Sequence, residues 1–286
     1  MKESILKIGA RLLMVAALTL AGGLLSATMV RLSPGYGVDE RELDPRLNRA
    51  SVEAVRSSRR IESGLLAYYR NYLVRALHGD FGKSQWLDRP VGSLVYERLP
   101  VTARSVLGGM FIAWVAALIV ALAALFFRGF LFDFSATATS SLLIALPTGV
   151  VAMFAVYLRA PAFLAISVVI FPKLFRYLRN LLEHAYGQPH ILAARTRGIS
   201  NARIVFRHVV PLVSPALFAL FGVSLSMAFG AAIPIEALTD SPGVGQLAWQ
   251  AALNRDLPLI VNLTLLVTLF TVTVNSVASI VPEMAQ

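Results

Sequence analysis

The run A-R-S-V-L-G-G-M-F-I-A-W-V-A-A-L-I-V-A-L-A-A-L-F-F, residues 103–127, is long and apolar enough to cross a lipid bilayer as a helix. A membrane-spanning helix needs about 20 predominantly apolar residues. Five further runs of this kind cover residues 12–30, 136–158, 161–178, 212–238 and 259–281. The sequence therefore predicts an all-α integral membrane protein with six transmembrane helices.

The composition also fits a membrane protein. Of the 286 residues, 57% are hydrophobic and 15% are charged, against roughly 25% charged residues in an average soluble domain. There is no cysteine, which excludes disulfides and thiolate metal sites. We assign the net charge of +10 to loops beside anionic membrane lipid. Nucleic acid is a poorer partner, because the basic loops lack interleaved aromatic residues for base stacking.

The first apolar run follows three basic residues, Lys2, Lys7 and Arg11. This arrangement also occurs in secretory signal peptides, and small residues follow at Ser26 and Ala27. We favour an uncleaved helix with its N-terminus inside the cell, because the run is nearly of membrane length and further spans follow it. Residues 1–30 are therefore assigned to an N-terminal tail and the first transmembrane helix.

Residues 31–102 are rich in charged side chains and contain no apolar run of membrane length. Such a segment does not cross a bilayer. It is expected to be a loop with short helices, for example over residues 62–77. Long loops are translocated largely regardless of their charge, so this loop is placed outside the cytoplasm. Residues 103–286 then form the core domain with five transmembrane helices.

The charge of the loop before the fifth span fixes the orientation. Residues 172–211 carry one acidic residue, Glu183, and seven basic ones: Lys173, Arg176, Arg179, Arg195, Arg197, Arg203 and Arg207. Because short loops with excess Lys and Arg stay in the cytoplasm, this loop and the N-terminus are placed inside. Six spans return the C-terminus to the same side, in a bacterial-type inner membrane.

Catalytic, cofactor and metal sites are not expected. The segment G-D-F-G-K-S at 79–84 ends like a phosphate-binding loop, but Leu77 stands where that motif needs its first glycine and no strand precedes it. His184, His190 and His208 share one loop at spacings that match no compact metal site. We expect no ATP hydrolysis by this chain.

Glu236 is the single ionisable residue expected deep inside a span. Buried ionisable residues are typical of ion and proton paths. A secondary carrier is an alternative function, but it would be expected to bury more of them. A membrane scaffold without a transport role is a second alternative.

The loop over residues 184–211 contains a short predicted helix. Pro189 can begin it, and Gly198 follows Arg195 and Arg197 as a helix stop with basic residues at the negative end. Ser200 or Asn201 can cap a second helix.

One side of the first helix is small, at Ala193 and Ala194, and another side is cationic. Such a helix suits insertion into the groove of a partner protein. The alternative is a plain connecting loop that lies on anionic lipid.

The positions Ala193, Ala194, Gly198 and Pro211 resemble the signature of permease subunits of ATP-binding-cassette (ABC) importers. The glutamate that usually leads this signature is Leu192 here. Residues 79–100, 203–211 and 235–260 are similar to passages of the dipeptide, oligopeptide and nickel branch, which belongs to the binding-protein-dependent transport systems. The link between spans three and four, and the C-terminus, are shorter than is usual in that family.

The resemblance implies one permease subunit of an ATP-driven importer that forms half of a path for peptides, nickel or other small solutes. The implied partners are a second permease subunit of different sequence, two cytoplasmic ATPase subunits and an extracytoplasmic binding protein. The residues implied in ATPase coupling are Gln188, Ile191, Ala193, Ala194, Arg195, Arg197, Gly198 and Pro211. Those expected at an outer gate or a binding-protein contact are Glu236, Pro242, Gly243 and Gly245.

Overall fold

The computed structural model describes residues 2–33, 65–126 and 130–284. These residues form helices and turns, with an isolated antiparallel bridge between Lys83 and Pro90. The helices are α1 (Lys2–Leu32), α3 (Leu65–Leu77), α4 (Val91–Phe126), α5 (Phe130–Ala145), α6 (Thr148–Tyr157), α7 (Ala162–Tyr186), α8 (Pro189–Thr196), α9 (Asn201–Ile204), α10 (Val210–Leu238), α11 (Val244–Leu253) and α12 (Leu257–Met284), with a π-helical turn η2 (Val205–Val209) before α10.

Four helical segments are long and apolar enough to cross a membrane: Gly9–Leu32, Val91–Phe126, Asn201–Leu238 and Leu257–Ser279. They correspond to four of the expected spans. A fifth candidate is the pair α5 and α6, which is bent by 95°. The structure therefore divides the span expected over residues 136–158 into two helices at a bend. Pro147 lies at the bend with an extended ψ of 141°, because proline lacks the N–H and the space that a continuous helix needs.

Two further boundaries differ from the expected ones. Residues 91–102, assigned to the loop, are the first turns of α4, which continues through Pro100. A search for apolar runs misses this part of the helix, because it contains the charged residues Glu97 and Arg98. The expected fourth span, residues 161–178, lies in helix α7, which extends to Tyr186 and is not among the candidate spans of the described residues. Part of the loop expected over 31–102, residues 34–64, lies outside the described residues.

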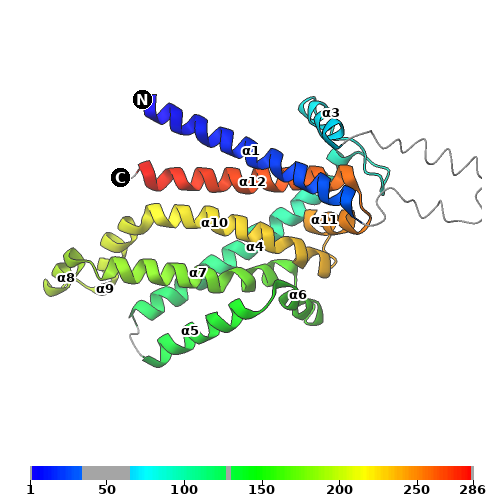
Figure 1. Cartoon of the computed structure of the whole chain (residues 1–286). Coiled ribbons are helices and arrows are strands. Elements are labelled where there is room, and N and C mark those ends of the chain that lie inside the picture. Colours follow the sequence, from blue (N-terminus) through cyan, green and yellow to red (C-terminus); the bar gives the residue numbers. More distant parts are fainter. Residues whose placement is uncertain (1, 34–64, 127–129, 285–286) are drawn as a thin grey trace, which may run out of the picture.

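The long helices form one bundle (Figure 1). They lie side by side in the order α1, α12, α10, α7 and α5, while α4 crosses the bundle and packs on α7 and α10. At one end, here called the α8 end, lie α8, α9, the beginning of α1 and the end of α12. At the other, the α11 end, lie α3, α6 and α11.

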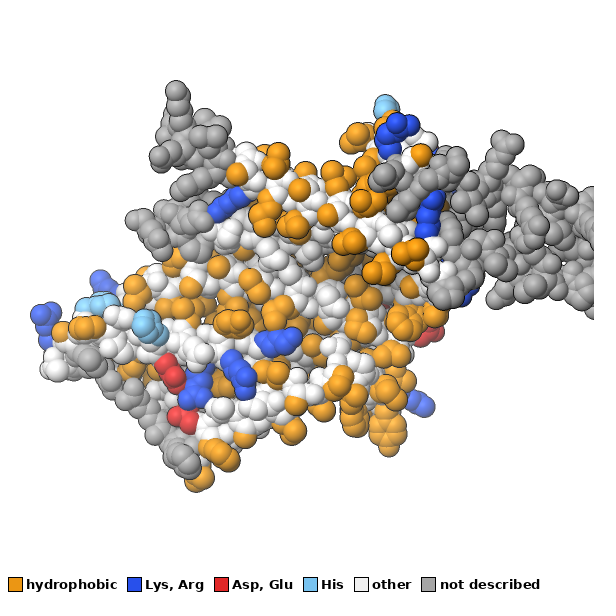
Figure 2. Space-filling model, in the orientation of Figure 1, with side chains coloured by type: hydrophobic (Ala, Val, Ile, Leu, Met, Phe, Trp, Pro, Cys, Tyr) orange, Lys and Arg blue, Asp and Glu red, His pale blue; other side chains and the backbone are white. Residues whose placement is uncertain are grey.

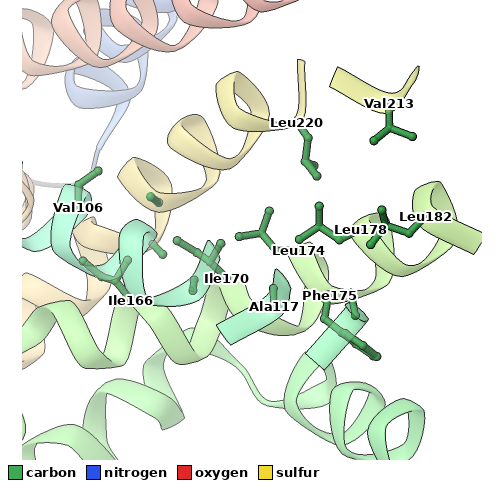
Figure 3. Packing of buried hydrophobic residues seen from close by; sticks show 14 of the residues in the cluster. Val106, Ala117, Ile166, Ile170, Leu174, Phe175, Leu178, Leu182, Val213 and Leu220 are labelled. Atoms are coloured by element: carbon green, nitrogen blue, oxygen red, sulfur yellow. The ribbon is translucent and has the colours of Figure 1, made fainter. Parts of the chain in front are cut away.

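The tightest packing joins α4 to α7. Small residues recur every four positions along α4, at Gly109, Ala113, Ala117 and Ala121, and all are buried. A Cβ atom on Gly109 would lie 2.7 Å from the carbonyl oxygen of Phe163. Small residues let membrane helices approach closely. Figure 3 shows the larger side chains of α7 in the space between α7 and its neighbours α4 and α10; those labelled on α7 are Ile166, Ile170, Leu174, Phe175, Leu178 and Leu182.

Helix α1 packs along α12, again through glycine. A Cβ atom on Gly23 would lie 2.5 Å from both Leu265 Cδ2 and the Tyr69 hydroxyl. That hydroxyl donates a hydrogen bond to the carbonyl oxygen of Leu20 (2.7 Å). The first helix is thus packed against both α12 and α3.

Candidate functional sites at the two ends of the bundle

Helix α8 begins and ends as its sequence predicts. Pro189 is its first residue and Thr196 its last. Gly198 follows with φ of +75°, a conformation that costs side-chain-bearing residues energy. A Cβ atom at this position would meet nothing within 4 Å. Gly198 is therefore required for the direction of the backbone and not for space.

The two faces of α8 differ in their surroundings. Ile191 is fully buried and Ala194 is 9% exposed, and both belong to the main hydrophobic cluster of the bundle. His190, Ala193 and Arg197 are exposed. The sequence placed Ala193 and Ala194 together on one small face, but in the structure Ala194 packs in the core and Ala193 lies at the surface. The side chains of Leu192 and Arg195 lie outside the described part.

The helices on either side of α8 are joined to each other. Tyr186, at the end of α7, donates a hydrogen bond from its hydroxyl to Asn201 Oδ1 on α9 (2.9 Å). Gln188 Nε2 lies 3.3 Å from His184 Nε2. Ser200 occupies the cap position of α9 but makes no side-chain capping bond.

The π-helical turn η2 precedes Pro211, which is exposed in the first turn of α10. A proline ring clashes with the carbonyl four residues earlier in an ordinary helix. Here that carbonyl belongs to Arg207, inside the wider turn. The conformation of η2 thus has a local cause in Pro211.

At the α11 end, a carboxylate joins three helices. Glu236, in the last turns of α10, is fully buried. Its Oε2 accepts hydrogen bonds from the N–H of Gly245 (2.8 Å) and from the hydroxyl of Thr102 on α4 (2.9 Å). Thr102 Oγ1 in turn accepts a hydrogen bond from the N–H of Val244 (2.7 Å). We call Glu236, Thr102, Gly243 and Gly245 the carboxylate cluster.

The two glycines of this cluster are required for close approach. A Cβ atom on Gly243 would lie 2.1 Å from Glu236 Oε2, and one on Gly245 would lie 2.7 Å from the Cα atom of Ile233. The structure thus brings together Glu236, Gly243 and Gly245, three of the residues predicted from the sequence. Pro242 is exposed beside them.

A second buried carboxylate holds the G-D-F-G-K-S turn. Asp256 is fully buried at the start of α12, where its Oδ1 accepts a hydrogen bond from the N–H of Leu259 (3.2 Å). Its Oδ2 accepts from the hydroxyl of Ser84 and from the N–H of Trp86 (3.1 Å). The turn follows helix α3 and not a strand. It is packed on α12 and has no phosphate-loop geometry.

A third contact joins α3 to α12. The hydroxyl of Tyr72 donates a hydrogen bond to Asn262 Oδ1 (2.6 Å), and Asn262 Nδ2 donates to the carbonyl oxygen of Phe81 (2.8 Å). Burial, with Tyr68 and Tyr69 close by, raises the pKa of the Tyr72 hydroxyl. The hydroxyl therefore stays protonated and remains a donor at neutral pH.

Thr102, Ser84, Asp256 and Tyr72 were not singled out from the sequence. Asp256 carries a recognisable signal, because an aspartate directly before L-P-L-I is typical of a helix start. For Thr102 we find no local signal, because its partners lie more than 130 residues away.

Residues 109–284 match the model of one protein family, the binding-protein-dependent transport system inner membrane component. The chain belongs to this family. The chain is 28% identical over 266 residues to the oligopeptide transport system permease protein OppB of Escherichia coli strain K12, covering 85% of each chain. It is 25% identical over 297 residues to a Brucella suis protein described as a peptide permease, covering 93% of this chain and 92% of the other.

These findings confirm the resemblance to ABC importer permeases of the peptide and oligopeptide family. The permease is a multi-pass inner-membrane protein, and its family consists of transport proteins and not of catalytic enzymes. Helix α8 and Glu236 lie within the matched residues, whereas Ser84 and Thr102 precede them.

Proposed function

We propose that this chain is one of two permease subunits of an ATP-driven importer and forms half of the path for peptides delivered by a binding protein. The single observation that carries the proposal is the family match over residues 109–284, together with relatives named as peptide permeases. A second, different permease subunit and two ATPase subunits complete the importer. Nickel or another small solute is the alternative cargo in the same family.

The proposed topology has six spans: α1, α4, the bent pair α5 and α6, α7, α10 and α12. The beginning of α1 and the end of α12 lie at the α8 end (Figure 1), which supports placing both termini in the cytoplasm. The basic residues Arg197, Arg203 and Arg207, which follow α8 or lie on α9 and η2, are at the same end, in agreement with the positive-inside rule. The α11 end, with α3, then faces the binding protein.

In this proposal the exposed face of α8, formed by His190 and Ala193 and followed by Arg197, binds a groove of an ATPase subunit. The buried residues Ile191 and Ala194 hold α8 on the bundle. A nucleotide state can shift the permease between conformations only through contacts that differ between those conformations. Because α8 is joined to α7 and α10, its displacement moves two helices that cross the bundle.

The carboxylate cluster lies at the opposite end of α10. It holds α4, α10 and α11 together beside the exposed Pro242, which supports a role at the outer gate or the binding-protein contact. Thr102 joins the expected residues as a position that orients Glu236.

Reconstituted uptake tests the proposal. Liposomes should contain this chain with the second permease, the ATPase subunits and the binding protein from the same gene cluster. We expect uptake of a radiolabelled tripeptide that requires both ATP and the binding protein. Uptake that proceeds without ATP, driven by an ion gradient, would instead favour a secondary carrier. No uptake by an intact complex with any peptide or nickel would favour a scaffold.

A further inference from the structure

One face of α7 is charged although the helix runs through the centre of the bundle. Lys173 and Arg176 lie three residues apart and therefore share a face. Lys173 is half-buried and Arg176 is exposed. Figure 2 shows a row of basic side chains over this region, between α7 and α5, with apolar side chains on both sides of it.

Hydroxyl groups of α5 line the same seam. Arg176 Nη2 donates a hydrogen bond to Ser141 Oγ (2.6 Å), and Arg179 Nη1 donates to Thr137 Oγ1 (2.6 Å). Arg179 also forms ion pairs with Asp133 (3.4 Å) and Glu183 (2.8 Å). Within the described part of the chain, Arg176 has a hydroxyl partner but no carboxylate, so its charge is not neutralised there. We call Lys173, Arg176, Thr137 and Ser141 the basic stripe.

The basic stripe lies at the depth of the apolar helices. Glu183 lines a hollow together with Ala124 and Leu125, close to Phe126, where α4 ends. At a rise of about 1.5 Å per residue, Arg176 lies about 10 Å and Lys173 about 15 Å from Glu183, toward the beginning of α7. The apolar core of a bilayer is about 30 Å thick. In the proposed topology, in which α7 is a span, both charges fall inside this core.

Charged side chains at this depth almost always face the interior of a helix bundle or a water-filled cavity. In this chain alone the stripe is uncovered, since Arg176, Thr137 and Ser141 are exposed. Lipid tails are therefore poor neighbours for the exposed side of the stripe, because they solvate neither cations nor hydroxyl groups. A water-filled passage is a good one, because water solvates both the hydroxyl groups and the cations.

We infer that the basic stripe lines the translocation passage and contacts the carboxylate of the peptide as it passes. This inference rests on the proposed function, because it requires a passage shared with a second permease subunit. Arg176, held by Ser141, can offer two parallel N–H donors to a carboxylate. Lys173 adds a second positive charge one helical turn away. A free metal cation would be repelled at the same place, so the stripe favours peptides over nickel as cargo.

The absence of cysteine from the chain allows a direct test in the assembled complex. Ser141→Cys places a reporter thiol in the stripe, and Leu18→Cys places one on the exposed surface of α1. Each is reacted in liposomes with two membrane-impermeant methanethiosulfonate reagents, one anionic and one cationic. The ratio of the two rates reports the local charge, because any change in the reactivity of the thiol itself affects both reagents equally.

We expect the thiol at position 141 to react with both reagents and the thiol at position 18 to remain unreactive. Adding Arg176→Gln should lower the ratio of anionic to cationic rate about tenfold, while Arg176→Lys should preserve it. In uptake with saturating binding protein, Arg176→Gln should also reduce the preference for trialanine over its C-terminal amide. The binding protein is the same in both cases, so a change in this preference reports the permease.

Three outcomes would overturn the inference while leaving the proposed function intact. In the first, the importer shows ATP-driven uptake but the thiol at position 141 does not react. In the second, the ratio of anionic to cationic rate does not change with Arg176→Gln. In the third, the preference for trialanine over its C-terminal amide does not change with that variant. The first would mean that lipid or the second permease covers the stripe. If no ATP-driven uptake occurs with all partners present, the proposed function itself is wrong and the inference is lost with it.

Discussion

Glycine is required at Gly198 for backbone conformation and at Gly243 for space. Position 198 has φ of +75° and open surroundings, whereas position 243 lies against Glu236 and Thr102. The two positions therefore respond differently to the same kind of substitution.

Gly198→Val should reduce peptide uptake at least fivefold while the permease still inserts into the membrane. A β-branched residue in the left-handed region costs roughly 1–2 kcal/mol, so the chain after α8 changes direction. Uptake and stimulated ATP hydrolysis are measured in the reconstituted complex. Gly198→Asn, which tolerates this conformation, should retain function. The control Gly187→Val lies at an ordinary φ of −82° and should also transport. Unimpaired uptake by Gly198→Val would show that the backbone conformation of Gly198 is not needed for transport.

Gly243→Ala should destabilise the permease by about 1–3 kcal/mol. The added methyl group collides with Glu236 Oε2 and with Thr102 Oγ1 (2.6 Å), so the carboxylate cluster must open. Thermal unfolding in detergent measures the effect. Gly230→Ala is the matched control on α10, because a Cβ atom there meets nothing within 4 Å. Equal stability of the two variants would contradict the described packing.

Glu236→Ala should lower both uptake and docking of the binding protein. It removes the acceptor of two buried hydrogen bonds, and each buried group left without a partner costs about 1–3 kcal/mol. Thr102→Val should produce the same defects, whereas Thr102→Ser, which keeps the hydroxyl, should not. Uptake rate and binding-protein affinity are compared for the three variants. If Glu236→Ala changed neither quantity, the cluster would have no part in the gate or the contact.

At the scale of elements, α3 is held on α12 by a hydrogen bond that depends on pH. The folded state raises the pKa of Tyr72 above its usual value of about 10, so the folded state binds more protons at high pH. The stabilisation is complete below pH 10 and is lost as the pH rises above it.

We therefore expect α3 to detach in alkaline buffer, measured as faster proteolysis within residues 65–77. Tyr72→Phe removes the hydroxyl, and it should weaken docking by about 1 kcal/mol and reduce this pH dependence; burial also raises the pKa of the Tyr69 hydroxyl on α3, so a smaller pH dependence should remain. Proteolysis of α3 that is independent of pH in the unaltered permease would contradict the role of the Tyr72 hydroxyl.

The sequence predicted those elements whose cause is local. Apolar length was sufficient to locate α1, α10, α12 and the apolar part of α4 after residue 102, and Pro189 and Gly198 were sufficient to locate α8. The bend between α5 and α6 also has a local cause, Pro147, which a search for apolar length overlooks. The charges of α7 concealed its length, because Lys173, Arg176 and Arg179 interrupt the apolar pattern.

The carboxylate cluster was predictable only in part. Glu236 was conspicuous as an acid in an apolar span, and Gly243 and Gly245 lie close to it in sequence. Thr102 and the pair of Ser84 and Asp256 depend on how distant segments pack, which a single sequence does not contain. The split of Ala193 and Ala194 between two faces likewise depends on how α8 lies on the bundle.

At the scale of the whole molecule, α10 connects the two candidate sites. It runs for 29 residues, about 43 Å at 1.5 Å per residue, from the π-helical turn beside α8 to the carboxylate cluster. A displacement of α8 by a bound ATPase would therefore reach Glu236 through one continuous helix. This arrangement gives the proposed coupling a physical path between the two faces of the membrane.

Capture of the ATPase by the exposed face of α8 tests this coupling most directly. Ala193→Glu places a bulky charge on that face, and Ala202→Glu places the same charge on the exposed surface of α9. The amount of ATPase subunit that co-purifies with the tagged, membrane-inserted permease is measured for both. We predict at least a tenfold loss for Ala193→Glu and little change for Ala202→Glu. Full recovery of the ATPase with Ala193→Glu would contradict the proposal that α8 couples this permease to ATP hydrolysis.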